Sequence, residues 1–144
     1  PRNLYDNPGN AFVGTFIGSP SMNVHEARIV EGGIDMNGYT VPIARDVLAK
    51  SSNPAKVLHG VRPEDLHLSE NGAQMTVTLV EELGADTYVY GAYDDAAGNK
   101  VDLVARDQGG RAPIIGQQVK VAPVRSYIFD AEGEQQRLSD PIDV

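Results

Sequence analysis

Apolar and polar residues alternate with a period of two along most of the chain from Met22 onward. Successive side chains of a β-strand point to opposite faces, so this alternation predicts strands with one buried face. The clearest alternating segments are Met75–Leu79, Val101–Arg106, Val119–Ala122 and Arg125–Asp130. One further stretch, Ile43–Lys50, is compatible with one or two helical turns.

Short clusters of turn-forming residues separate these segments. They are Glu31–Gly33, Met36–Gly38, Glu70–Gly72, Asp94–Asn99, Asp107–Gly110 and Ala131–Gly133. Asn-Gly and Gly-rich pairs supply the positive φ angles that tight hairpins need. Many short strands at close spacing predict a mainly β fold, either a barrel or a sandwich.

The first twenty residues follow a helical pattern instead. The apolar residues that share one helical face are Phe12, Val13, Phe16 and Ile17. Asn10 is a good N-cap, and Gly18-Ser19-Pro20 is a stop signal. We therefore predict a short amphipathic helix over Asn10–Ile17. Its phenylalanines need a surface to cover, either in this domain or in a neighbour.

Composition and charge narrow the function classes. The 144 residues carry 20 acidic and 12 basic side chains, a net charge of −8, and no cysteine. Basic residues form no run, which argues against nucleic-acid binding, because phosphate contacts supply most of that affinity. No apolar stretch approaches the roughly 18 residues of a membrane span. The start at Pro1 lacks Met, and we interpret the chain as an excised or processed fragment.

Motifs for catalysis and for metal binding are weak. The segment from Gly91 to Lys100 lacks the glycine directly before the lysine and the following Ser or Thr of a phosphate-binding loop, so we interpret it as a hairpin tip. The histidines, His25, His59 and His67, do not show metal-ligand spacing and are interpreted as solvent-edge or satisfied structural residues. Asp94 and Asp95 do not follow the twelve-residue calcium loop. A serine or histidine nucleophile stays open, although no Gly-x-Ser-x-Gly elbow exists.

Tyrosines and acidic residues gather in the segment 80–94. Tyr88 and Tyr90 share one predicted strand face, with Tyr93 on the other. Aromatic residues on one face of an oligonucleotide-binding barrel can stack bases, but the acidic neighbours would repel a phosphate backbone. We therefore favour cross-strand packing.

Two segments stand out as candidate interaction elements. In the first, 58–66, Pro63 fixes a turn and Arg62 and Glu64 lie within pairing distance of each other or of a partner; the alternative is an exposed ion pair. In the second, 80–86, the strand ends in acids and Gly84 permits a sharp corner or a bulge. The residue chemistry alone indicates a β domain without an active site.

Four elements resemble the MalK/UgpC-like class of sugar-importer ATPases. Residues 4–23 resemble the end of that family's ATPase domain, with Gly14 in place of its usual Ala. Gly60–Leu66 resembles its G-[IV]-R-P-E-x-[LIV] element, and 80–87 its V-E-x-L-G-x-E-T element, with Asp86 for Glu. Ser126–Asp130 is similar to its closing L-H-L-F-D element, with Tyr127 where His is common.

The resemblance implies a domain organisation. Residues 1–20 would be the C-terminal end of the ATPase domain or a linker helix. Residues 21–144 would form a β-rich regulatory domain of TOBE/MOP type, built from OB-like antiparallel β barrels. ATP and Mg would bind a preceding ATPase domain, so this chain would hold no cofactor or metal and would not itself be an enzyme. The alternative is a small-anion-binding sensor of MOP type.

The resemblance also implies partners and candidate contact residues. The domains would form a homodimer, meet their own ATPase domain, act indirectly on permease subunits and receive a regulatory protein, without nucleic acid. The protein would lie in the cytoplasm at the inner face of the membrane. Candidate interface or regulatory residues are Arg62, Glu64, Glu81, Gly84, Phe129 and Asp130. Candidate contacts to the ATPase domain are Phe12, Phe16 and Ile17.

Overall fold

A computed structural model describes residues 9–10, 21–95, 97–107 and 112–144. Its first sheet has the strand order β10-β9-β4-β1-β2-β3, and neighbouring strands are antiparallel. The bounds of these strands are β1 Asn23–Val30, β2 Gly33–Met36, β3 Tyr39–Pro42, β4 Lys56–Val61, β9 Arg125–Phe129 and β10 Ile142–Asp143. The helix α3 (Arg45–Leu48) follows β3, and the 3-10 turn η1 (Pro63–Asp65) follows β4.

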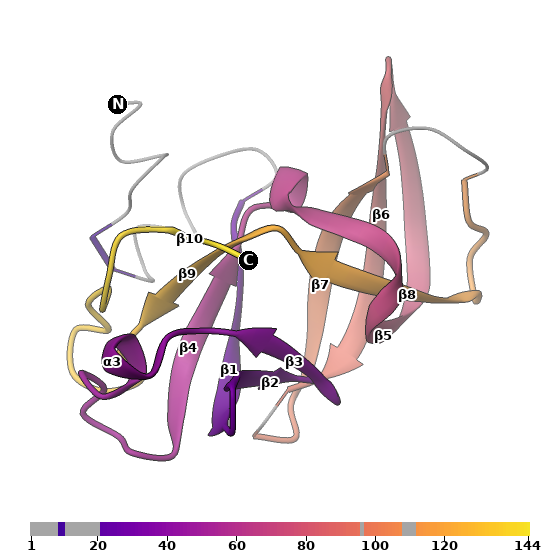
Figure 1. Cartoon of the computed structure of the whole chain (residues 1–144). Helices are drawn as coiled ribbons and strands as arrows, with labels where there is room; N and C mark the ends of the chain where they lie inside the picture. The colour runs from indigo at the N-terminus through magenta and orange to yellow at the C-terminus, as the bar shows by residue number, and fades with distance from the viewer. Residues whose placement is uncertain (1–8, 11–20, 96, 108–111) are drawn as a thin grey trace.

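The second sheet lies beside the first (Figure 1) and has the order β6-β7-β5-β8, with an additional pairing of β5 with β6. Its strands are β5 Leu66–Leu83, β6 Asp86–Asp94, β7 Lys100–Asp107 and β8 Gln118–Pro123. The two ends of the long β5 pair differently, because His67 pairs with β7 while 76–83 pair with β6. β6 and β7 also pair with each other, so the sheet closes on itself. The predicted mainly β, OB-type fold is confirmed.

The predicted helix over Asn10–Ile17 lies largely outside the described residues, as do Phe12, Phe16 and Ile17. The proposed division at residue 20 therefore stays a prediction. Helix α3 falls within the stretch for which helical turns were predicted. Over the described ranges, no helix combines the length and the apolar character that crossing a bilayer requires.

The predicted turn at Glu70–Gly72 is wrong, because these residues lie inside β5. Leu68 and Ala73 both pair with Val121, so the residues between them form a bulge rather than a chain reversal. A Cβ atom on Gly72 would lie 2.2 Å from the carbonyl oxygen of Val121. The glycine is thus needed because two backbones approach closely here. In the sequence, a glycine with this role looks the same as a glycine in a turn.

The predicted turns at Met36–Gly38 and at Gly84 are confirmed, whereas the predicted turn at Asp107–Gly110 lies largely outside the described residues. Asn37 and Gly38 have φ angles of 49° and 91° at the β2–β3 hairpin, where Met36 pairs with Tyr39. Gly84, with φ of 66°, lies in the two-residue connection between Leu83 and Asp86. Two-residue connections of this kind favour residues that tolerate positive φ.

The strand β9 is buried on both faces, whereas the alternation predicted only one. Ile128 faces the main core, and Tyr127 and Phe129 join a second apolar cluster with Met22 and Leu58. Gly60 of β4 makes room for this cluster, because a Cβ there would lie 2.6 Å from Met22 Sδ and 2.9 Å from a Phe129 ring carbon.

The two sheets share the main core, which contains residues from both. Asn23 of β1 also joins them directly. Its side-chain Nδ2 donates to the Val104 carbonyl at 2.9 Å, and its Oδ1 accepts from the Val104 N–H at 2.8 Å. One buried amide therefore pairs with β7 as a strand neighbour would.

Candidate functional site

The four candidate residues of the first sheet lie at opposite ends of the β4–β9 pair. Arg62 directly follows β4 and is 1% exposed, so the alternative interpretation, an exposed ion pair, is wrong about the exposure of Arg62. Its guanidinium hydrogen-bonds to the Tyr127 phenol. Burial raises the pKa of Tyr127, and the nearby Arg62 charge acts in the opposite direction. Glu64, in η1, is half-buried.

At the other end of this strand pair lie Phe129 and Asp130. Phe129 is fully buried and stacks on Tyr127 with 6.5 Å between ring centroids. Asp130 accepts hydrogen bonds from Ser52 Oγ at 2.6 Å, Ser52 N at 3.2 Å and Glu132 N at 3.1 Å. These bonds, led by that of the Ser52 side chain, lower the pKa of Asp130. Asp130 thus joins the loop before β4 to the turn after β9.

Glu81 and Gly84 lie apart from the other four, in the β5–β6 hairpin. Glu81 Oε1 accepts a hydrogen bond from Tyr90 Oη at 2.5 Å, which is the leading cause that raises the pKa of Tyr90 to about 12. Tyr93 is on the opposite, buried face of β6, as predicted. The structure therefore separates the six candidates into three places.

The β5–β6 hairpin and the loop before β8 carry exposed large apolar side chains. We call this set the apolar ridge; it consists of Leu79, Leu83, Ile114 and Ile115, which are 45%, 56%, 71% and 67% exposed. The loop is held against β5 by hydrogen bonds from Gly116 N to Val77 O and from Val77 N to Gln117 O. Exposed large apolar side chains are typical of interaction surfaces where they lie together.

A buried polar chain crosses three strands of the first sheet, and sequence analysis missed it. His25 of β1 faces its cross-strand partner His59 of β4, with 2.7 Å between His25 Nε2 and His59 Nδ1. His59 Nε2 lies 2.8 Å from Ser126 Oγ of β9. His25 Nδ1 lies 3.0 Å from the Glu26 carbonyl oxygen.

The hydrogen positions in the buried polar chain follow from the acceptor at one end of it, the Glu26 carbonyl. A carbonyl oxygen only accepts, so His25 Nδ1 carries the hydrogen and its Nε2 is the acceptor. His59 then donates from Nδ1, and Ser126 donates to His59 Nε2. Burial lowers the pKa of His25 to about 4 and also lowers that of His59, so both rings are neutral near pH 7.

The buried polar chain contains a serine hydrogen-bonded to a histidine, which is also the arrangement of a catalytic nucleophile and its base. Ser126 and His59 are, however, 0% exposed. A substrate carbonyl therefore has no route to the Ser126 hydroxyl. The buried polar chain instead satisfies the hydrogen-bonding groups of its own buried side chains. The interpretation of His25 and His59 as satisfied structural histidines is confirmed.

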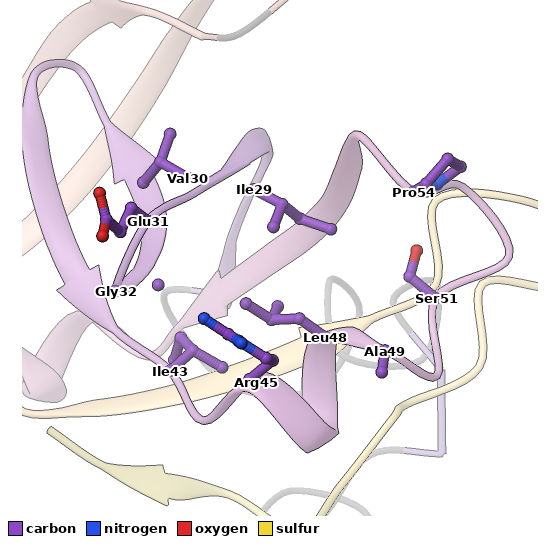
Figure 2. A pocket seen from close by; sticks show the side chains of 11 residues that line it. Ile29, Val30, Glu31, Gly32, Ile43, Arg45, Leu48, Ala49, Ser51 and Pro54 are labelled. Atoms are coloured by element: carbon purple, nitrogen blue, oxygen red, sulfur yellow. The ribbon is translucent and has the colours of Figure 1, made fainter.

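A cleft of about 480 Å³ lies between the end of β1, the start of β2 and α3 (Figure 2). Its apolar wall includes Ile29, Ile43 and Leu48, and Glu31 and Arg45 supply opposite charges. Among the described residues, no carboxylate lies within 4.0 Å of the Arg45 guanidinium. The cleft therefore combines an apolar wall with one charged side chain of each sign.

Two further clefts, each of about 290 Å³, are rich in carboxylates. One is lined by residues that include Asp130, Glu132 and Glu134, and the other by Glu26, Asp35, Asp94 and Asp95. Carboxylates oppose the binding of anions. In the described part of the chain, no three His, Cys, Asp or Glu side chains are grouped so as to hold a metal ion.

Comparison with protein families identifies two adjacent matches. Residues 18–66 match the MalK OB fold domain, and residues 59–126 match the TOBE domain. The two matches meet at β4 and η1, where the chain passes from the first sheet to the second.

Three relatives illustrate the similarity. The chain is 38% identical to the diacetylchitobiose uptake system ATP-binding protein MsiK of Streptomyces coelicolor, over 85% of this chain and 37% of that protein. It is 36% identical to the sn-glycerol-3-phosphate import ATP-binding protein UgpC of Cereibacter sphaeroides, over 92% and 36%. It is 33% identical to the trehalose import ATP-binding protein SugC of Mycobacterium tuberculosis, over 92% and 42%. The chain therefore spans little more than a third of the length of these relatives.

Proposed function

Because the chain belongs to the family of MalK-type OB-fold and TOBE domains, we propose that it is the regulatory and dimerisation domain of the ATP-binding subunit of a bacterial carbohydrate importer. The relatives named for the uptake of diacetylchitobiose and trehalose support this class of cargo. In this proposal ATP and Mg bind a separate ATPase domain. The present chain holds no cofactor, hydrolyses nothing itself and supports uptake by holding partners.

The apolar ridge is the observation that carries the dimerisation part of the proposal. Each of its four side chains exposes roughly half or more of its surface: Leu79, Leu83, Ile114 and Ile115. Both sheets bury many other apolar side chains, so these four are exceptions. Burying these side chains against a second copy would stabilise the dimer by about 25 cal/mol for each Å² of apolar surface removed from water. A second copy presents the same ridge and is therefore a chemically matched partner.

The proposed setting follows from the same family membership. The chain would contact its own ATPase domain and, through it, the permease subunits, at the cytoplasmic face of the membrane. A regulatory protein is a further proposed partner. The small-anion alternative has no support from the two acidic clefts, because their carboxylates oppose the binding of anions.

Sedimentation equilibrium on the 144-residue chain tests the proposal. We expect concentration-dependent dimers for the unchanged chain. The double variant Leu79→Glu/Ile115→Glu should be monomeric over the same range, because two carboxylates would be placed in each half of the contact.

Val124→Glu provides the matched control, since Val124 is also exposed, at 42%, and is not part of the ridge. It should dimerise like the unchanged chain. Dimerisation of the double variant at unchanged affinity would contradict the assignment of the ridge, and a strictly monomeric unchanged chain at high concentration would contradict dimerisation. ATP hydrolysis by this chain alone would contradict the non-catalytic role.

A further inference from the structure

A small acidic cleft lies where the first sheet meets the β6–β7 hairpin. Its lining comes from β1, from the β2–β3 hairpin and from the end of β6. The lining residues are Glu26, Arg28, Asp35, Asn37, Gly38, Tyr93, Asp94 and Asp95, around a volume of about 290 Å³. A group bound in this cleft would contact both sheets at once.

The charges of the lining favour a cation. Four carboxylates face one guanidinium, that of Arg28. Two carboxylates have neighbouring lysines, since Glu26 pairs with Lys56 at 3.1 Å and the exposed Asp94 lies 3.9 Å from Lys100. Asp35 and Asp95 have no ion pair within the described part of the chain.

The oxygens of these two aspartates are only half used by the protein. Asp35 Oδ1 accepts from Gly38 N at 3.0 Å, and Asp95 Oδ1 accepts from Ala97 N at 3.0 Å and Asn99 N at 2.9 Å. Within the described residues, the Oδ2 atom of each aspartate accepts no hydrogen bond. Both atoms are therefore available to a donor in the cleft.

Tyr93 is the independent observation that points to a bound group. This residue is only 4% exposed, and its buried hydroxyl has no hydrogen-bond partner among the described residues. The ring is fixed by an edge contact with His25, with 5.3 Å between centroids. Tyr93 lines the cleft together with Asp35 and Asp95, and burial, followed by the charges of Asp95 and Asp35, raises the pKa of Tyr93. A buried hydroxyl without a partner costs about 1–3 kcal/mol, so it calls for an explanation.

We propose that this cleft binds an organic cation through its alkylammonium or guanidinium group, with Asp35, Asp95 and the Tyr93 hydroxyl as the acceptors. A metal ion is the poorer fit, because the described residues place no three acidic or histidine ligands together. An ammonium group offers three donors, which matches the three acceptors. The inference goes beyond the proposed function and does not depend on dimerisation.

A cation of this kind has two sources, a free small amine or a basic side chain of another protein. Titrations of the full chain by calorimetry at low ionic strength and pH 7.5 can distinguish them. One arm uses 1,4-diaminobutane and another uses the peptide acetyl-Gly-Lys-Gly-amide. Sulfate and trehalose serve as the anionic and the neutral probes. Saturable binding of either amine supports the proposal, and the tighter of the two identifies the source.

Two variants locate the binding. Tyr93→Phe removes only the hydroxyl and should weaken amine binding about 5- to 10-fold, the loss of one hydrogen bond. Asp35→Asn keeps an acceptor for Gly38 N but removes the charge, and it should weaken binding about tenfold or more. Glu134→Gln, an equal charge change at an exposed position outside the cleft, should leave the affinity unchanged within about twofold.

Three results would overturn the proposal: no saturable binding of either amine, equal binding of sulfate, or unchanged amine affinity in Tyr93→Phe. The last result would mean that the Tyr93 hydroxyl does not contact the bound amine. Tyr93→Phe removes a buried group without a partner, so the variant should fold. Its unfolding midpoint in urea verifies this, which separates a lost site from a lost fold.

Discussion

The first sheet and the β5–β6 hairpin place their apolar side chains in opposite ways. In the first sheet both faces of β9 are buried, and even the large ring of Phe129 in the second apolar cluster is 0% exposed. In the hairpin, Leu79 and Leu83 end a long strand with about half of their surface in water. The first sheet is therefore complete as a packed unit, and the hairpin is not.

The same contrast holds for polar groups. The Ser126–His59 hydrogen bond of 2.8 Å is fully enclosed, whereas the Tyr90–Glu81 bond of 2.5 Å lies on a half-buried strand face. A polar group inside the first sheet must keep its partner, because water cannot replace it. The comparison teaches that changes in the first sheet should act on stability, and changes in the hairpin on association.

The largest expected effect comes from truncating Phe129. Phe129→Ala should reduce the free energy of unfolding by about 3–5 kcal/mol, because it leaves a cavity between Met22, Gly60 and Tyr127. Leu79→Ala should reduce it by only about 1 kcal/mol, since about half of the side chain is already in water. Urea denaturation followed by circular dichroism measures both.

Phe129→Leu is the control, because it retains most of the apolar volume and should lose less stability than the alanine variant. Equal losses for Phe129→Ala and Leu79→Ala would break the comparison. In that case the hairpin would be as tightly packed as the first sheet.

The second expected effect concerns pH. Burial lowers the pKa of His25 to about 4 and lowers that of His59, whereas both rings have a pKa near 6.5 in the unfolded chain. Their contribution to stability is complete above pH 6.5 and is lost as the pH falls toward 4, because only the unfolded chain binds the protons there. Between pH 7 and 5, His25 alone should account for a loss of about 2 kcal/mol.

Urea denaturation at several pH values measures this loss. The variant His67→Gln should show the same dependence, because His67 lies outside the buried chain and hydrogen-bonds to the Glu64 carbonyl. A free energy of unfolding that stays constant from pH 7 to 5 would show that water reaches the His25–His59 pair.

Local chemistry was sufficient to predict many elements of this fold. The alternation at 101–106 places Leu103 and Ala105 on the buried face of β7, and Asn37-Gly38 supplies the positive φ angles of a hairpin. Such features depend on residues a few positions apart. Glu70–Gly72 shows the limit, because the use of Gly72 depends on Val121, far along the chain.

The candidate sites depended on distant pairings to a larger degree. His25 and His59 are 34 positions apart, and Ser126 follows 67 positions after His59, so only the strand register brings them together. The burial of Arg62 and the separation of Glu81 from Asp130 have the same origin. Sequence patterns identified residues that could form contacts, but the strand order decided which of them meet.

The smallest expected effect is that of Tyr90→Phe, which forms a matched pair of hydroxyl deletions with Ser126→Ala. Ser126→Ala should reduce the free energy of unfolding by about 1–3 kcal/mol, because His59 Nε2 keeps no donor inside the sheet. Tyr90→Phe removes a hydrogen bond that is shorter, yet it should cost less than about 1 kcal/mol, because water can reach Glu81. Ser126→Thr, which keeps the hydroxyl, separates loss of the donor from a change in packing. A larger loss of stability in Tyr90→Phe than in Ser126→Ala would contradict this comparison. It would mean that the length of a hydrogen bond matters more to stability here than its burial.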